Sequence, residues 1–261
     1  MINEKTFHAK FYTVVDQFKQ WMPKNFDFSN SNILDFGCEY GVMTLAIALR
    51  LKPKKVIGID INSYHKQLLE IIKDNINIEA LPKNLEFYEV NAVDTYSYQC
   101  KFDVIFSWST FEHINQPNLH EVVNNLYDCL SPNGFIFVQI SPLYYSAFGS
   151  HLDTLINVPW AHLSMQNNLL HHQVMNSPKN DFYRDEDDNN YQKIKNSIWG
   201  CYETLNKITA DDLIELFENN GFYTIKQIRT YCSQKPSKSL LRVFNKEILE
   251  TEQVVALFKK Q

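Results

Sequence analysis

Short apolar runs alternate with helical patterns over the first 140 residues, and this alternation limits the possible folds more than any other feature of the chain. We expect strands at Ile33–Phe36, Val56–Asp60, Leu85–Val90, Phe102–Trp108 and Phe135–Ile140. Helical patterns lie between them, at Met43–Leu51, Tyr64–Asn75 and Leu119–Leu130. Strands that alternate with helices favour a mostly parallel sheet with helices on its faces. The sequence therefore predicts a doubly wound α/β core.

Other segments flank this core, whose first part we place at residues 31–145. Apolar residues at helical spacing from Phe7 to Met22, ended by Pro23, predict a helix within residues 1–30 that acts as an N-terminal helical lid. Residues 146–207 lose the regular pattern and include an acidic run at 181–188. We expect a helical or irregular cap there, partly mobile.

The regular pattern returns in residues 208–261, the second part of the core. Thr209 and Asp212 are spaced to cap a helix that Gly221 ends. Two apolar runs follow, Phe222–Thr230 and Leu240–Phe244, and since no helical pattern separates them we expect an antiparallel hairpin. A short helix near Lys246–Lys259 is predicted to end the chain.

Composition narrows the class of protein. The chain has 261 residues, 44% of them apolar, which is enough to build a sizeable core. Its formal charge of -5 gives no sign of a nucleic-acid partner. We find no apolar window long enough for a membrane span and no leader pattern, so we expect a cytoplasmic protein without a membrane partner. The five cysteines are widely spaced, which favours reduced thiols.

The stretch "NILDFGCEYG", residues 32–41, predicts a ligand-binding loop at the end of the first strand. Gly37 permits a tight exit from the strand, and Gly41 lets the next helix approach a ligand. Asp60 ends the second strand about 20 residues later, where a carboxylate can accept both ribose hydroxyls. Dinucleotide loops have a glycine in the middle, whereas this loop has Glu39, which would lie near a pyrophosphate. A ligand with a cationic end is therefore favoured.

Four segments at these positions resemble successive motifs of the class I S-adenosylmethionine-dependent methyltransferases. They are "ILDFGCEYGVMTLAIAL", "VIGIDIN", "FYEVNAVDTYSYQCKFDVIFSWSTFEHI" and "LSPNGFIFVQISP". The resemblance covers roughly Asn32 to Ser141, and the final hairpin resembles the reversed seventh strand of that fold. It implies a Rossmann-like, seven-stranded, mostly parallel sheet with an antiparallel last strand.

The resemblance also implies roles for individual residues. The methionine part of S-adenosylmethionine would lie on Asp35, Gly37, Cys38 and Gly41. The ribose would bind Asp60 and the adenine would contact Ile61, Asn91, Ala92 and Val93. Asn91 stands where this family often has Asp, and its amide oxygen can still accept from the adenine amino group. Ser107 would face the methyl end of the cofactor.

Methyl transfer to a hydroxyl or a protonated amine needs a proton acceptor, most often histidine. We expect His113, which follows the fourth strand, and His151 and His162, which follow the fifth, to converge on one mouth, the opening of the site at the carboxyl edge of the sheet. His151 and His162 are the first candidates for the base. Some similar methyltransferases use a Glu-x-x-Glu-His pattern to bind a metal, but Ser109 occupies the first Glu position here. Whether Glu112 and His113 bind a metal or form a structural turn stays open.

The expected activity is transfer of a methyl group to a small-molecule acceptor, at oxygen rather than at nitrogen or carbon. In this fold, segments after the fifth strand commonly set specificity, so the cap at 146–207 is predicted to contact the acceptor. Its aromatic residues suit a small, partly apolar molecule. Two alternatives remain: a protein or peptide methyltransferase, and a subunit that binds S-adenosylmethionine without catalysis.

Overall fold

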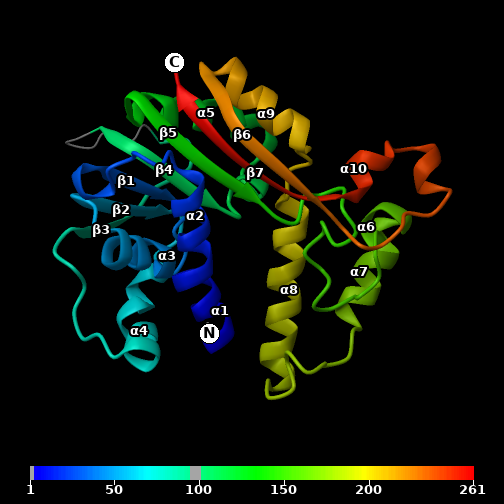
Figure 1. Ribbon diagram of the computed structural model, residues 1–261. Coiled ribbons are helices and arrows are strands. Elements are labelled where there is room, and N and C mark those ends of the chain that lie inside the picture. The colour runs from blue at the N-terminus through cyan, green and yellow to red at the C-terminus, as the bar shows by residue number, and fades with distance from the viewer. Residues whose placement is uncertain (1–2, 95–100) are drawn as a thin grey trace.

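A seven-stranded sheet forms the centre of the protein in a computed structural model that describes residues 3–94 and 101–261 (Figure 1). The strands are β1 (Asn32–Phe36), β2 (Lys55–Asp60), β3 (Leu85–Glu89), β4 (Phe102–Trp108), β5 (Leu130–Ile140), β6 (Phe222–Tyr231) and β7 (Thr251–Lys260). Their order in the sheet is β3-β2-β1-β4-β5-β7-β6. The first five pair in parallel, and β7 is antiparallel to both of its neighbours. The predicted fold class is confirmed.

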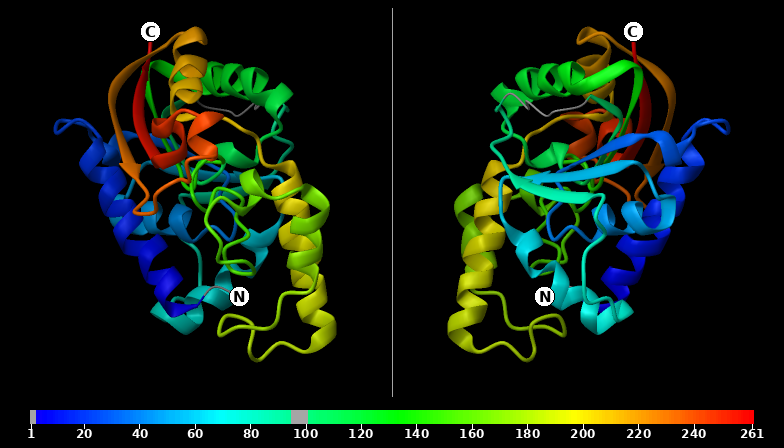
Figure 2. Two further views of the ribbon diagram at one scale, coloured as in Figure 1. Left: turned by 90° about the vertical axis from the view of Figure 1, so that its right-hand side faces the viewer. Right: turned by 90° about the vertical axis from the view of Figure 1, so that its left-hand side faces the viewer.

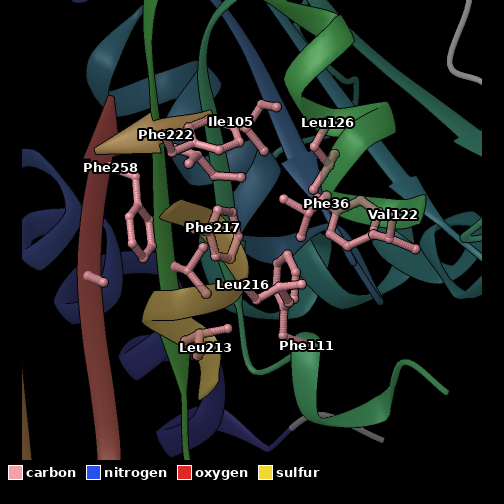
Figure 3. Packing of buried hydrophobic residues seen from close by; sticks show 14 of the residues in the cluster. Phe36, Ile105, Phe111, Val122, Leu126, Leu213, Leu216, Phe217, Phe222 and Phe258 are labelled. Atoms are coloured by element: carbon pink, nitrogen blue, oxygen red, sulfur yellow. The ribbon is translucent and has the colours of Figure 1, made fainter. Parts of the chain in front are cut away.

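Helices cover both faces of the sheet. On one face lie α5 (Leu119–Cys129) and α9 (Ala210–Asn219). The apolar residues of α5 recur three and four positions apart, so they form a single buried face: Leu119, Val122, Val123 and Leu126. Figure 3 shows how Val122 and Leu126 of α5 and Phe217 of α9 meet side chains of the sheet. This packing fixes the strand ends that build the site.

The other face is covered by α3 (Val42–Ala46), α4 (Leu68–Ile76) and the N-terminal helix. That helix comprises α1 (Glu4–His8), a π-helical segment (Ala9–Val14) and α2 (Val15–Trp21). Its Phe18 ring packs 5.0 Å from the ring of Phe106 in β4. Arg50, which follows α3, donates to the Phe11 and Tyr12 carbonyls at 3.0 and 2.9 Å. The N-terminal helix is therefore held both by ring packing on β4 and by the hydrogen bonds from Arg50.

The end of the chain differs from the prediction. The run at 240–244, predicted as a strand, begins with a 3-10 turn. The last strand, β7, covers most of the stretch 246–259 for which we predicted a helix, and it ends at Lys260. A short helix, α10 (Lys246–Glu250), precedes that strand. Because β7 lies between β5 and β6 and both its faces are covered, its residues 254–258 are all buried. A continuous apolar run of this kind has no periodicity that separates strand from helix.

The cap at 146–207 is more regular than predicted. It contains α6 (Ala161–Ser164), α7 (Asn167–Met175) and α8 (Asp188–Thr204). These helices have a small apolar core of their own, which includes Leu152, Leu155, Leu170, Val174, Tyr191 and Trp199. The acidic run leads directly into α8, whose N-cap Asp187 accepts from the Asn190 amide at 2.9 Å. Figures 1 and 2 show that α7 and α8 lie side by side and extend away from the sheet.

Two further expectations concern the chain as a whole. Of the five cysteines, Cys38, Cys201 and Cys232 are free thiols, and Cys100 lies outside the described residues. Within residues 3–94 and 101–261, the structure contains no helix with the length and apolarity that a membrane crossing requires.

Candidate active site

The loop between β1 and α3 packs so closely against Thr110 and Phe87 that Gly37 and Gly41 have no room for a side chain. Gly37 and Gly41 have φ angles of 83° and 77°, which L-residues rarely adopt. A Cβ atom on Gly37 would lie 2.1 Å from Oγ1 of Thr110, after β4. On Gly41 it would lie 2.6 Å from the Phe87 ring of β3. The loop therefore presents its backbone at the carboxyl ends of the parallel strands, where ligands bind in this kind of sheet.

Asp60 ends β2 beside this loop. Its two carboxylate oxygens accept from the backbone amides of Glu39 and Asn62, at 2.9 and 2.8 Å. A carboxylate oxygen has a second lone pair, so both can still accept from a ribose. The next side chain, Ile61, is 62% exposed, which leaves an apolar surface next to the carboxylate. The structure thus places the two residues side by side at the mouth.

The predicted adenine contacts follow β3, which pairs with β2. The Asn91 backbone and side-chain nitrogens donate to the Asp94 carboxylate at 3.1 and 3.2 Å. Ala92 and Val93 pack against the edge of the core, and the Val93 carbonyl accepts from Asn125 at 3.0 Å. Because β2 and β3 are parallel neighbours, these residues lie at the same sheet edge as Asp60.

Two of the predicted residues are fully buried under the loop. Asp35 accepts from the Thr44 hydroxyl at 2.6 Å, while its other carboxylate oxygen has no hydrogen-bond partner. Burial, and less strongly the charge of Asp60, raises the pKa of Asp35 to about 7. The Ser107 hydroxyl donates to the Phe36 carbonyl at 3.1 Å, so it ties β4 to β1. Burial also raises the pKa of the Cys38 thiol, which therefore stays neutral.

Three titratable side chains converge on the other side of the same mouth. Glu112 and His113 lie on the turn after β4, and His151 lies in the loop after β5. One ligand atom of each lies within 4.8 Å of the others, and the two imidazole rings meet edge to face with their centroids 5.2 Å apart. The charge of Glu39 in the glycine loop counteracts the burial that lowers the pKa of His113. His113 therefore lies close enough to the glycine loop for the charge of Glu39 to affect its pKa.

His151 is suited to accept a proton. Burial lowers its pKa to about 4, an effect that the hydrogen bond to the Pro142 carbonyl only partly opposes. The ring is consequently neutral at pH 7. Nε2 has no hydrogen-bond partner, so its lone pair is the open position of the neutral ring.

His162 is not among the three possible metal ligands, but its charge contributes to the lowered pKa of His151, so the two rings are near one another. His162 lies on α6, where Nε2 bonds the Tyr144 carbonyl at 2.7 Å and Nδ1 is buried without a partner. Trp160, two residues before it, is 3% exposed. It packs in an apolar cluster with Cys232, Leu240 and Leu249, so it joins the cap to the C-terminal part of the chain.

Asn206, near the end of the cap, holds the turn that carries Glu112 and His113, and no sequence pattern indicated this role. Its side-chain amide donates to the carbonyls of Phe111 and Ile114, at 2.5 and 2.8 Å. Its backbone amide donates to the Glu112 carbonyl at 3.0 Å. More than 90 residues separate these partners along the chain, so a local motif could not have revealed them.

Glu112, His113 and His151 offer one carboxylate and two imidazoles, a donor set that suits divalent transition metals. Glu112 is buried, and burial raises its pKa to about 8 against the opposing effect of backbone hydrogen bonds from Glu112 and Ser141. The Glu-x-x-Glu-His pattern itself does not fit. Its first position is Ser109, whose hydroxyl donates to the Gln139 side chain at 3.0 Å.

A separate hollow is lined by residues that include Tyr145, Thr209 and Arg229, and its lining contains no residue of the glycine loop or of the histidine pair (His113 and His151). The Arg229 guanidinium already pairs with Asp211 at 2.6 Å and Glu247 at 3.3 Å. Because the guanidinium is already paired with two carboxylates, it is not available to bind a charged ligand in this hollow. The glycine loop and the histidine pair remain the candidate site.

The sheet order, the reversed last strand and the glycine loop define a class I S-adenosylmethionine-dependent methyltransferase. The family described as "Methyltransferase domain" matches residues 8–227, and the chain belongs to this family. The protein is an enzyme of this class, and its cofactor is S-adenosylmethionine. The residues fit this cofactor, since Asp60 lies beside the loop and retains acceptor capacity for a ribose.

Curated relatives match only part of the chain. A carboxy-S-adenosyl-L-methionine synthase of Campylobacter jejuni is 25% identical over 46% of this chain and 48% of its own length. A release factor glutamine methyltransferase of Aliivibrio fischeri is 34% identical over 34% of this chain and 30% of its own length. The chain thus spans about half or less of the length of these relatives.

Solved structures match nearly the whole chain. An S-adenosylmethionine-dependent methyltransferase of Clostridium acetobutylicum has a TM-score of 0.56 at 13% identity, covering 99% of this chain and 92% of its own. Magnesium protoporphyrin IX methyltransferase of Synechocystis, solved with bound SAH, has a TM-score of 0.52 at 10% identity, covering 100% and 89%. At such low identity the similarity concerns the fold.

Proposed function

We propose that this methyltransferase transfers the methyl group to an oxygen atom of a small molecule, and that the histidine pair accepts the proton of the acceptor hydroxyl. The observation that carries the proposal is the position of His113 and His151 at the mouth of the glycine loop. The cofactor supplies an electrophilic methyl group when bound. The protein's own residues then have two tasks, to align the acceptor and to remove its proton.

The state of the histidines supports an acceptor that must lose a proton. A carboxylate attacks without a base, whereas a hydroxyl needs one. His151 is neutral at pH 7, and its Nε2 is free of other hydrogen bonds, so it can accept that proton. Asn206 fixes the turn that bears His113, which preserves the geometry of the pair.

The cap supports a small acceptor rather than a protein. It is a folded unit with its own apolar core, and its residue Asn206 contacts the turn beside the histidines. The acidic run that could dock a basic protein is partly compensated within the chain, because Lys179 pairs with Asp188 and Arg184 with Asp181. We therefore assign the mouth between cap and core to a small, partly apolar molecule.

Transfer of a radioactive methyl group tests this proposal. The enzyme is incubated with methyl-labelled S-adenosylmethionine and a cell extract that has been separated by ultrafiltration into metabolites and proteins. We expect label in the metabolite fraction, in a product that resists the mild alkali that cleaves methyl esters. Label in the protein fraction alone would establish a protein methyltransferase, and cofactor binding without transfer to either fraction would indicate a non-catalytic subunit.

A further inference from the structure

Glu39, the unusual residue of the glycine loop, forms an ion pair with Lys10 of the N-terminal helix. Glu39 has a φ angle of 50°, which lies in the left-handed region that glycine usually occupies. The Lys10 and Glu39 side chains are 23% and 44% exposed. They line a small surface hollow together with Cys38, Tyr40 and Met43.

This ion pair lies at the end of the site that we assign to the methionine part of the cofactor. The Glu39 amide is bound to Asp60, so the residue is held at the mouth. The charge of Lys10 reaches the buried carboxyl of Asp35, whose pKa it lowers against the larger effect of burial. Lys10 therefore lies close to both acids of the loop.

The free end of S-adenosylmethionine is a zwitterion, with one ammonium and one carboxylate group. Lys10 and Glu39 present the complementary charges at the edge of one hollow. An ion pair that is partly exposed contributes little to stability, so its opening costs little. Each partner would then gain a charge-assisted hydrogen bond to the ligand.

We propose that Lys10 and Glu39 open their ion pair to bind the methionine end of the cofactor, Lys10 contacting its carboxylate and Glu39 its ammonium group. The N-terminal helix, which Arg50 fastens to the layer beneath it, thus contributes a residue to the cofactor site. The cofactor's amino-acid end is recognised by charge on both sides. This inference concerns cofactor binding alone and is independent of the acceptor proposed above.

Calorimetric titration with three ligands tests the two contacts separately. S-adenosylmethionine has both charged groups, its decarboxylated analogue has only the ammonium, and 5′-methylthioadenosine has neither. For Lys10→Ala we expect affinity for S-adenosylmethionine to fall about tenfold or more, with the other two ligands unaffected. For Glu39→Gln we expect weaker binding of the first two ligands and unchanged binding of methylthioadenosine.

Lys19→Ala, which alters an exposed lysine on the same helix, is the matched control and should bind all three ligands normally. Equal losses for all three ligands in Lys10→Ala would mean that the ion pair only fastens the helix, and would overturn the inference. Unchanged affinity for S-adenosylmethionine in both variants would overturn it too. Since no acceptor is present, these results are separate from the outcome of the labelling experiment.

Discussion

At the scale of single residues, Asp60 is the most direct test of the cofactor site. Removing its carboxylate deletes the proposed ribose acceptor and frees the Glu39 amide, which it now holds at 2.9 Å. We expect Asp60→Ala to weaken S-adenosylmethionine binding by more than about tenfold, as for loss of hydrogen bonds to a charged group. Calorimetry measures this, with Asp185→Ala, an exposed aspartate of the cap, as a control. Unchanged affinity would refute the ribose assignment.

Asp35 makes stability depend on pH. Its pKa rises on folding from 3.8 to about 7, chiefly because it is buried. Between these values the folded protein holds a proton that the unfolded chain has released, so stability falls as pH rises from about 4 to about 7. Asp35→Asn removes this titration. We expect its free energy of unfolding, relative to the wild type, to increase by about 1 kcal/mol per pH unit in that window.

Urea denaturation at pH 5, 6 and 7 measures this difference. The Thr44 hydroxyl can donate to the new amide oxygen, so the variant retains the hydrogen bond seen at 2.6 Å. Curves of stability against pH that run parallel for variant and wild type would show that Asp35 is ionised throughout.

Residues in local motifs could be predicted, and residues paired across the fold could not. We predicted the loop from Asp35 to Gly41, and Asp60 after it, because an apolar strand, a glycine-containing loop and an acidic residue follow one another in the sequence. Asn206 and the turn it holds are separated by more than 90 positions, and Lys10 and Glu39 by 29. Only the packed helices and cap bring such partners together, so no spacing rule applies to them.

At the scale of elements, the glycine loop depends on close packing between its neighbours. In Gly41→Ala the new Cβ would meet the Phe87 ring at 2.6 Å in a left-handed backbone conformation. We expect a loss of about 2–5 kcal/mol in the free energy of unfolding, from backbone strain and overpacking together.

Gly200→Ala in α8 is the matched control, because nothing lies within 4 Å of its added Cβ. There we expect a gain of about 0.5–1 kcal/mol, since alanine favours a helix over glycine. Chemical denaturation of the two variants gives both values. Equal effects would mean that the loop tolerates a side chain and that its close packing is not what requires glycine.

Element prediction succeeded where periodicity or punctuation was clear. Each of the five parallel strands overlaps a short apolar run of the sequence. The helix α9 begins after Thr209, which forms both hydrogen bonds of a capping box with Asp212. Element prediction failed for β7, which is buried on both faces, and it gave no bounds for the helices within the cap. The helices of the cap gain stability from packing on one another, which composition alone does not reveal.

At the scale of the whole molecule, the site is made by three parts of the chain. The sheet provides the loop and the strand ends, the N-terminal helix brings Lys10, and the cap brings Asn206. In Figure 2 the N-terminal helix and the cap helices flank the end of the sheet from opposite sides. The architecture therefore explains why both flanking segments bear on a site whose motifs lie in the core.

The same histidine pair could act as a base or, with Glu112, as ligands of a divalent cation. Dialysis against a chelator separates the two roles. If the pair is the proton acceptor, methyl transfer should survive dialysis, and metal analysis of the purified enzyme should find less than one equivalent of any divalent transition metal. Transfer that stops on chelation and returns with one added cation would assign the cluster to metal binding.

The measurement that tests the central claim most directly is methyl transfer by His113→Ala and His151→Ala, alongside their affinity for the cofactor. Each variant is assayed with labelled S-adenosylmethionine and the metabolite fraction, and its cofactor binding is determined by calorimetry. We predict unchanged affinity and a fall in transfer of about a hundredfold or more in at least one of them, the usual contribution of a general base. Full transfer in both variants would contradict the account.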